Sequence, residues 1–167
     1  MPAVVTAGAL PWHEMLRTIL TAWLACAALM AQTGKEGGRL KTATGSFEVK
    51  MLPPGAPAED GFLRLSLEKS FQGGLEGSSR VAMMATSDGR SPSGGYVALE
   101  RFTGKLDGKA GGFVMQHSGI MSPGSTELRI VISPASGTGE LAGITGKLEI
   151  RIEGKQHFYT LEYQLAQ

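Results

Sequence analysis

The sequence contains no asparagine, has a single cysteine, Cys26, and carries charge on only 19% of its residues. A lone cysteine cannot form a disulfide within the chain, so burial of apolar side chains must hold the fold together. The 16 basic and 15 acidic residues nearly cancel. This balance lacks the cationic surplus of nucleic-acid-binding proteins, and we expect no nucleic-acid partner.

Glycine and apolar residues are what the chain has in abundance. It contains 24 glycines, and 42% of its 167 residues are hydrophobic. Low charge together with many glycines is typical of a turn-rich β protein and not of a helical bundle or a disordered chain. The length suffices for one domain of ordinary size.

The N-terminal segment has the composition of an export signal. Residues 18–31 (TILTAWLACAALMA) are apolar, follow Arg17 and end on a small residue, which predicts a signal peptide over residues 1–31 cleaved after Ala31. Residues 1–14 contain no lysine or arginine, so Met15 is the better start of this signal. The run is shorter than the roughly 20 apolar residues of a membrane span. We therefore expect a periplasmic or extracellular protein without a stable membrane span; an uncleaved anchor is the alternative.

The rest of the chain divides into a short linker and one domain. Residues 32–41 are polar and glycine-rich and predict a flexible linker. From residue 42 to residue 167, apolar and polar residues alternate with the period of two that a half-buried strand requires. The clearest examples are residues 46–51, 63–68, 147–153 and 159–165.

A short glycine motif recurs between these strands. Gly-x-Leu-x-Gly occurs at residues 73–77, 104–108 and 139–143, and its second copy contains the turn dipeptide Asp107-Gly108. The three copies predict three hairpins, and single strands near 43–51 and over 156–165 complete a set of eight. The expected fold is all-β, an eight-stranded antiparallel closed barrel, with a two-sheet sandwich as the alternative. The predicted hairpins pair 62–71 with 78–86, 95–103 with 111–118, and 126–133 with 145–153.

Two partner strands combine apolar faces with polar residues. Residues 96–102 (YVALERF) carry Glu100, and residues 112–119 (GFVMQHSG) carry Gln116 and His117. We identify Glu100 and His117 as candidate catalytic residues and Gln116 as a candidate ligand contact. A carboxylate in a dry lumen would have a raised pKa and could exchange protons. The alternative is structural, with Glu100 in an ion pair and His117 as an ordinary strand residue; the pattern leaves open which face is inside.

Aromatic residues supply the remaining candidates. Tyr96 and Phe102 share one strand face with Glu100, and Tyr159 and Tyr163 share the dry face of the last strand. All four are candidate ligand contacts, although completing the core is the alternative for the two C-terminal tyrosines. After cleavage two histidines and no cysteine remain, so we expect no metal site. We also find no P-loop and no G-x-S-x-G motif, and expect no cofactor.

Four segments resemble a known family: ATGSFEVK at 43–50, LERFTGKLDGKAGGFVMQHSG at 99–119, SGTGELAGITG at 136–146 and YTLEYQL at 159–165. They are similar, in this order, to the bacterial domain-of-unknown-function family 3224. That family's fold resembles the allene oxide cyclase barrel, which implies a closed eight-stranded barrel here. The resemblance also places the family's Glu, Gln and His on Glu100, Gln116 and His117. It implies no established activity.

The sequence is compatible with three functions. The first is an exported barrel that binds a small apolar molecule in its lumen. The second is a cofactor-independent isomerase or cyclase resembling allene oxide cyclase, with Glu100 as the acid or base. The third is a structural homo-oligomer, since residues 96–102 are apolar on both faces of the strand.

Overall fold

The computed structural model describes residues 38–53, 61–87 and 91–166, and these contain strands but no helix. Consequently, no helix in these ranges is long and apolar enough to cross a membrane. The predicted signal peptide, residues 1–31, lies outside the described residues, as does most of the predicted linker. Of the linker, Gly38 is buried against the backbone of Leu165, and Lys41 already belongs to the first strand.

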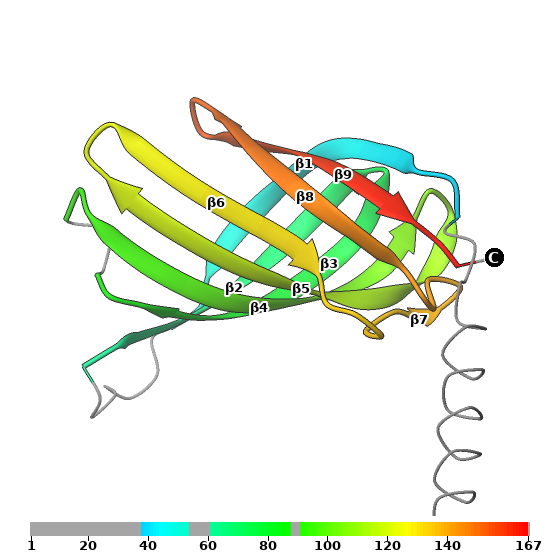
Figure 1. Cartoon of the computed structure of the whole chain (residues 1–167), viewed down its shortest axis with the longest axis horizontal. Coiled ribbons are helices and arrows are strands. Elements are labelled where there is room, and N and C mark those ends of the chain that lie inside the picture. The colour runs from blue at the N-terminus through cyan, green and yellow to red at the C-terminus, as the bar shows by residue number, and fades with distance from the viewer. Residues whose placement is uncertain (1–37, 54–60, 88–90, 167) are drawn as a thin grey trace, which may run out of the picture. The chain divides into compact units, whose positions relative to one another are not determined.

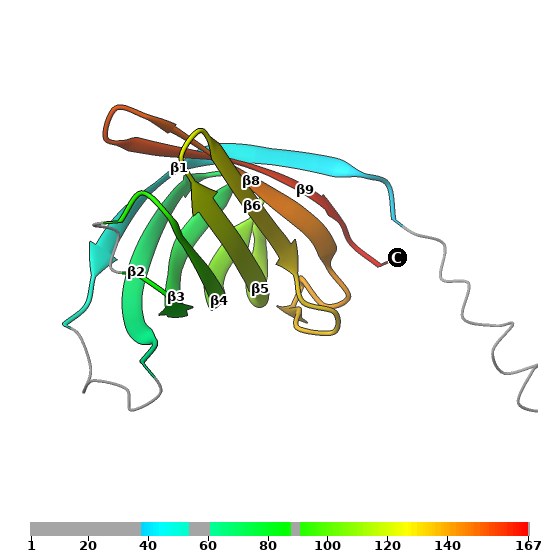
Figure 2. The same cartoon turned by 60° about the vertical axis from the view of Figure 1, so that its left-hand side comes forward.

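The predicted closed antiparallel barrel is confirmed (Figures 1 and 2). Each long strand pairs with antiparallel neighbours on both sides, and pairing of β4 with β5 closes the ring of eight. The strands are β1 (Lys41–Met51), β2 (Leu63–Gly73), β3 (Leu75–Ala85), β4 (Gly94–Leu106), β5 (Lys109–Ser122), β6 (Ser125–Ile132), the two-residue β7 (Thr138–Gly139), β8 (Thr145–Glu153) and β9 (Gln156–Gln164).

Two copies of the glycine motif form tight turns, as predicted. The first joins β2 to β3 through Gly74, and the second joins β4 to β5 at Asp107-Gly108. Asp107 has φ of 47° and Gly108 has φ of 82°. A two-residue hairpin loop of type I′ needs positive φ at both positions, which explains the Asp-Gly sequence.

The third predicted hairpin is wrong in its detail. β6 and β8 are neighbours in the ring, but their ladder contains the single pair Val131 and Lys147. The chain between them does not turn tightly, because β7 leaves the ring to pair with Gly111 and Gly112 of β5. The third motif therefore lies in a long connection that crosses one end of the barrel (Figure 1).

This connection closes one end of the barrel, on the right in Figure 1. The central leucines of the three motifs, Leu75, Leu106 and Leu141, are completely buried, and so is Ile144 of the connection. They belong to the large core cluster that also contains six aromatic side chains: Phe47, Phe71, Phe102, Phe113, Tyr159 and Tyr163. The repeated motif thus contributes one core leucine per copy as well as its turns.

At the opposite end, on the left in Figure 1, the inward-facing side chains are less buried. A smaller core cluster of Leu67, Val81 and Ala98 lies in this half of the barrel. Beyond it, side chains on the inward-facing side of the strands remain 37–61% exposed. We call this the exposed end; these side chains are Val49, Met51, Leu63, Met121, Leu128 and Ile152.

The closed end should contribute much of the stability. We expect Leu141→Ala to lower the free energy of unfolding by about 2–5 kcal/mol, because it leaves a cavity among fully buried side chains. Leu99→Ala is the matched control, since Leu99 is 56% exposed and should change stability by less than about 0.5 kcal/mol. Urea unfolding of both variants measures this. Equal effects would show that Leu141 does not plug the barrel.

Candidate functional site

The structure settles which faces of β4 and β5 point inward. Glu100 and His117 both lie inside the barrel, and Glu100 is completely buried. Alternation along each strand imposes this, because Phe102 and Met115 on the same faces belong to the large core cluster. Glu100 and His117, which the sequence predicted to be close together, are therefore brought to one site.

Glu100 is the centre of a buried polar cluster. Its Oε2 accepts a hydrogen bond from Lys69 Nζ at 2.6 Å, and its Oε1 accepts one from Ser79 Oγ at 2.5 Å. His117 Nε2 lies 2.9 Å from the same Oε2. The four side chains come from β2, β3, β4 and β5, so the cluster joins half of the barrel wall.

The contact between His117 and Glu100 is close without being a well-directed hydrogen bond. The two atoms are 2.9 Å apart, yet the direction of the ring N–H leaves Nε2 without a hydrogen-bond partner among the described residues. Hydrogen bonds weaken steeply as their geometry departs from linearity.

The expected raised pKa of Glu100 is wrong. Burial alone would raise this pKa, but His117, Lys69 and Ser79 together outweigh burial and hold the pKa of Glu100 below its ordinary value of 4.5. The carboxylate is thus kept ionised by its neighbours. The same negative charge acts on Tyr96, whose pKa is raised by burial and by Glu100.

Lys69 and Ser79 are the two members of this cluster that sequence reasoning missed. Both were visible as polar residues at inward positions of alternating strands: Lys69 follows Leu65 and Leu67 on one face of β2. Ser79 likewise precedes Val81 on the inward face of β3. Lys69 Nζ also lies 4.9 Å from the centre of the Phe47 ring, a cation–π contact that further anchors the ammonium group.

Gln116 does not join the cluster. It lies between Met115 and His117 in β5, so its side chain points to the outer face, where it is exposed. Gln116, a candidate ligand contact, therefore does not face the interior of the barrel. Phe102 does face inward, but it is completely buried in the large core cluster.

The two C-terminal tyrosines also belong to the packed core. The Tyr159 hydroxyl accepts a hydrogen bond from Leu75 N at 2.7 Å, and its pKa is raised chiefly by burial. The Tyr163 hydroxyl donates to Asp107 Oδ2 at 2.6 Å, and burial followed by Asp107 raises its pKa. Each hydroxyl therefore stabilises the closed end. The two tyrosines complete the core, which was the alternative to a role as ligand contacts.

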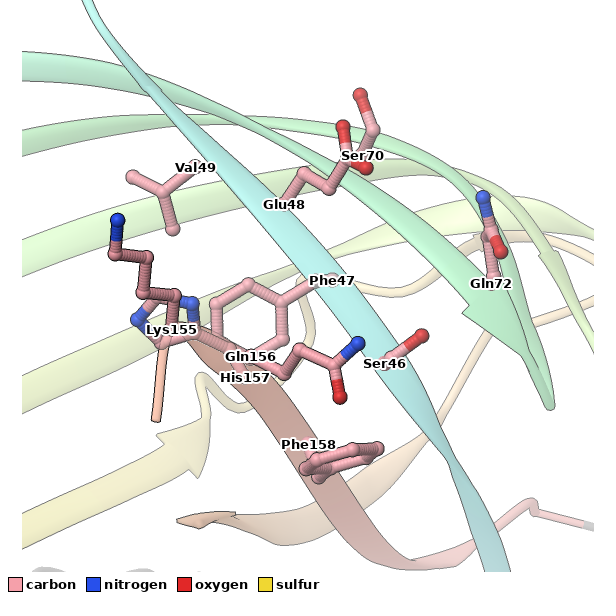
Figure 3. Close-up of a pocket in the computed structure, with 10 residues that line it drawn as sticks. All are labelled: Ser46, Phe47, Glu48, Val49, Ser70, Gln72, Lys155, Gln156, His157 and Phe158. Carbon is pink, nitrogen blue, oxygen red and sulfur yellow. The ribbon is translucent and has the colours of Figure 1, made fainter. Parts of the chain in front are cut away.

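A groove of about 520 Å³ lies beside the start of β9 (Figure 3). On one side, the His157 ring stacks on Phe47 with the ring centres 5.1 Å apart. The lining is otherwise mostly polar and includes Glu48, Lys155 and Gln156. This groove therefore offers hydrogen bonds to a solute, whereas the inward face of the exposed end offers apolar contact.

The described part of the chain contains no group of three or more acidic, histidine or cysteine side chains that could hold a metal ion. The charges of the polar cluster pair internally instead.

The ion pair should be strongly coupled. We expect Lys69→Met to lower the free energy of unfolding by about 3–5 kcal/mol, because it leaves a buried carboxylate without its cation. Glu100→Gln should have a loss of similar size, since it leaves the ammonium group unpaired. The double variant should lose much less than the two losses added together. Additive losses in urea unfolding would contradict a direct interaction.

The lowered pKa also predicts a pH dependence. The stability that it confers is present above the ordinary pKa of 4.5 and is lost as pH falls through the lower value in the folded protein. The difference in unfolding free energy between the wild type and Glu100→Gln should therefore be constant near neutral pH and shrink in acid. Taking the difference cancels the other carboxylates. A difference that does not change with pH would show an ordinary pKa.

Comparison with known proteins gives one family. The profile described as "Protein of unknown function (DUF3224)" matches residues 43–163. A crystal structure of a protein with unknown function from the DUF3224 family of Shewanella oneidensis MR-1 is similar, with a TM-score of 0.69 and 40% sequence identity. The similarity covers 77% of this chain and 99% of that chain. No curated protein matches. The chain therefore belongs to the DUF3224 family, as its sequence segments indicated.

Proposed function

We propose that this barrel binds a small, largely apolar molecule on the inward face of its exposed end. The observation that supports this is the set of inward-facing aliphatic side chains that stay 37–61% exposed there. Inward-facing side chains at the closed end, such as Leu75 and Leu106, are completely buried. Apolar surface in contact with water is a source of binding free energy when a ligand covers it.

The polar cluster sets the depth to which such a ligand reaches. Lys69, Ser79, Glu100 and His117 lie between the large core cluster and the smaller one. The Glu100 carboxylate accepts hydrogen bonds from Lys69 and Ser79, so the ion pair is satisfied within the cluster and forms a polar layer across this part of the barrel. Tyr96, partly buried and packed on the smaller cluster, lies on the exposed side of this layer. We therefore propose Tyr96 as a ligand contact and the cluster as a structural boundary.

The geometry gives less support to the isomerase alternative. General acid or base catalysis near neutral pH works best with a carboxyl group whose pKa is raised towards that pH. The pKa of Glu100 is lowered, and both of its oxygens already accept hydrogen bonds. Glu100 and His117 thus act on the shape of the site, and the proposed activity is binding.

Our proposal for the place of action is based on the sequence alone. We propose that the protein is exported and acts in the periplasm or outside the cell, as residues 1–31 predict. A soluble carrier of apolar molecules suits an aqueous compartment, since its ligand partitions poorly into water.

Titration with the fluorescent apolar probe N-phenyl-1-naphthylamine tests the binding proposal. We expect saturable binding to the full-length chain in the absence of vesicles. Met121→Thr combined with Leu128→Thr should weaken it by about tenfold or more, because the pair removes aliphatic contact from the inward face.

The matched control is Val97→Thr combined with Leu99→Thr, which changes two exposed aliphatic side chains on the outer face of β4. This pair should leave probe binding unchanged. Absence of saturable probe binding, or an equal loss of probe affinity in both double variants, would contradict the proposal. If the proposal holds, native mass spectrometry of protein purified from its own host should show a bound small molecule.

A further inference from the structure

The outer face of β3, β4 and β5 carries an exposed apolar patch. Ala82 lies opposite Leu99, Met84 lies opposite Val97, and Ile120 follows on β5 opposite Gly95. Val97, Leu99 and Ile120 are 56–61% exposed. We call these five residues the outer patch: Ala82, Met84, Val97, Leu99 and Ile120. Soluble monomers seldom leave neighbouring aliphatic side chains uncovered in this way, so the patch indicates a partner.

Two grooves meet at this patch and differ in chemistry. The first, of about 650 Å³, has a mostly apolar lining that includes Met84 and Val97. The second, of about 460 Å³, is lined in part by Arg80 and Arg101. Ser66, Ala82 and Leu99 line both grooves. The side chains of Ser66 and Ala82 are small, so the surface is shallow where the two grooves meet. An apolar surface thus continues directly into a cationic one.

The border of the outer patch is cationic. Arg101 lies directly opposite Arg80 across β3 and β4, and Glu68 pairs with Arg80 only. Arg129 lies on β6 opposite Ser118, beside Val97. Within the described part of the chain, neither Arg101 nor Arg129 has a hydrogen bond or ion pair. Like charges directly opposite in a sheet are unfavourable, so an anion at Arg101 would stabilise this surface.

The remaining charges near the patch do not reverse this balance. Glu127 lies opposite Ile120 at the border, and Arg64 lies opposite Met84 on the other side. Leaving Arg64 aside, the described residues around the outer patch include three arginines, Arg80, Arg101 and Arg129, against two carboxylates, Glu68 and Glu127, although the whole chain has a formal net charge of only +1. The partner should combine an apolar phase with negative charge.

We propose that the outer patch docks on the surface of a bilayer containing anionic lipids. The aliphatic side chains of β3 to β5 contact the acyl chains, and Arg101 and Arg129 bind lipid phosphates. A second copy of this chain fits less well, because it carries the same surplus of arginines on this face and brings no surplus of negative charge to compensate it. The proposal rests on outward-facing residues and does not depend on a ligand inside the barrel.

Vesicle co-sedimentation of the full-length chain tests the proposal. We expect binding to mixed phosphatidylglycerol–phosphatidylcholine vesicles, with much weaker binding to phosphatidylcholine alone or at high ionic strength. Val97→Thr combined with Leu99→Thr should lower the partition coefficient by about tenfold or more. Arg101→Gln and Arg129→Gln should each lower it roughly fivefold at low ionic strength.

Matched controls separate the patch from general effects. Leu40→Thr removes an aliphatic side chain as exposed as Val97, at 57%, and Lys105→Gln removes a cation from the outer face of β4. Neither should change the partition coefficient. All these proteins carry the same residues 1–37, so differences among them report on the barrel wall.

Three results would overturn the proposal. The first is a partition coefficient that the patch variants and the control variants change equally, or an absence of vesicle binding. The second is a dimer, seen in sedimentation without lipid, that Val97→Thr combined with Leu99→Thr dissociates and that does not bind vesicles. The third is binding to polyglutamate but not to vesicles, which would identify an acidic polypeptide as the partner.

Discussion

The interior of this barrel depends on one buried charge. Glu100 is completely buried, and an ionised carboxylate in an apolar interior is stable only when other groups replace the water it has lost. Lys69 and Ser79 donate to its two oxygens, and His117 lies 2.9 Å from one of them. Because these residues come from four consecutive strands, satisfying one carboxylate fixes the mutual register of half the wall. A one-residue slip in any of these strands would turn its polar group to the outside.

The cluster also explains why the two ends of the barrel differ. On its closed side, aromatic rings and the leucines of the glycine motifs form one buried core cluster. On its other side, the small core of Leu67, Val81 and Ala98 gives way to aliphatic side chains exposed to solvent. Replacing a buried ion pair by apolar residues is often neutral or stabilising. Stability alone therefore does not explain a charged layer at this level. A polar boundary beneath an exposed apolar face, as proposed above, does explain it.

Much of this architecture could be predicted from the sequence, because period-two alternation and Gly-rich turns report directly on half-buried strands. The eight long strands and the Asp107-Gly108 hairpin were predicted in this way. The connection between β6 and β8 was not, since nothing local distinguishes a tight hairpin from a segment whose Leu141 plugs the barrel. The proximity of Glu100 to His117 could be predicted, because their two strands are joined by the Asp107-Gly108 turn. Their orientation did not follow, because both faces of β4 are apolar and the pattern left open which face is inside. Lys69 interrupts an apolar face of β2, and that interruption was the available signal for a buried cation.

Strand β4 is apolar on both of its faces, and this pattern bears on what surrounds it. A strand that is apolar on both faces is ordinarily covered on both faces. Here Ala98 and Phe102 are buried inside, while Val97 and Leu99 of the same strand face outward and stay exposed. The sequence of β4 thus describes a strand between two apolar environments, and the barrel supplies only one of them. No described residue supplies the other, which is the environment that we propose a bilayer surface to provide. The arginines that border the outer patch limit what it can be, because an uncharged or cationic cover would leave Arg101 and Arg129 desolvated beside it without a counter-charge.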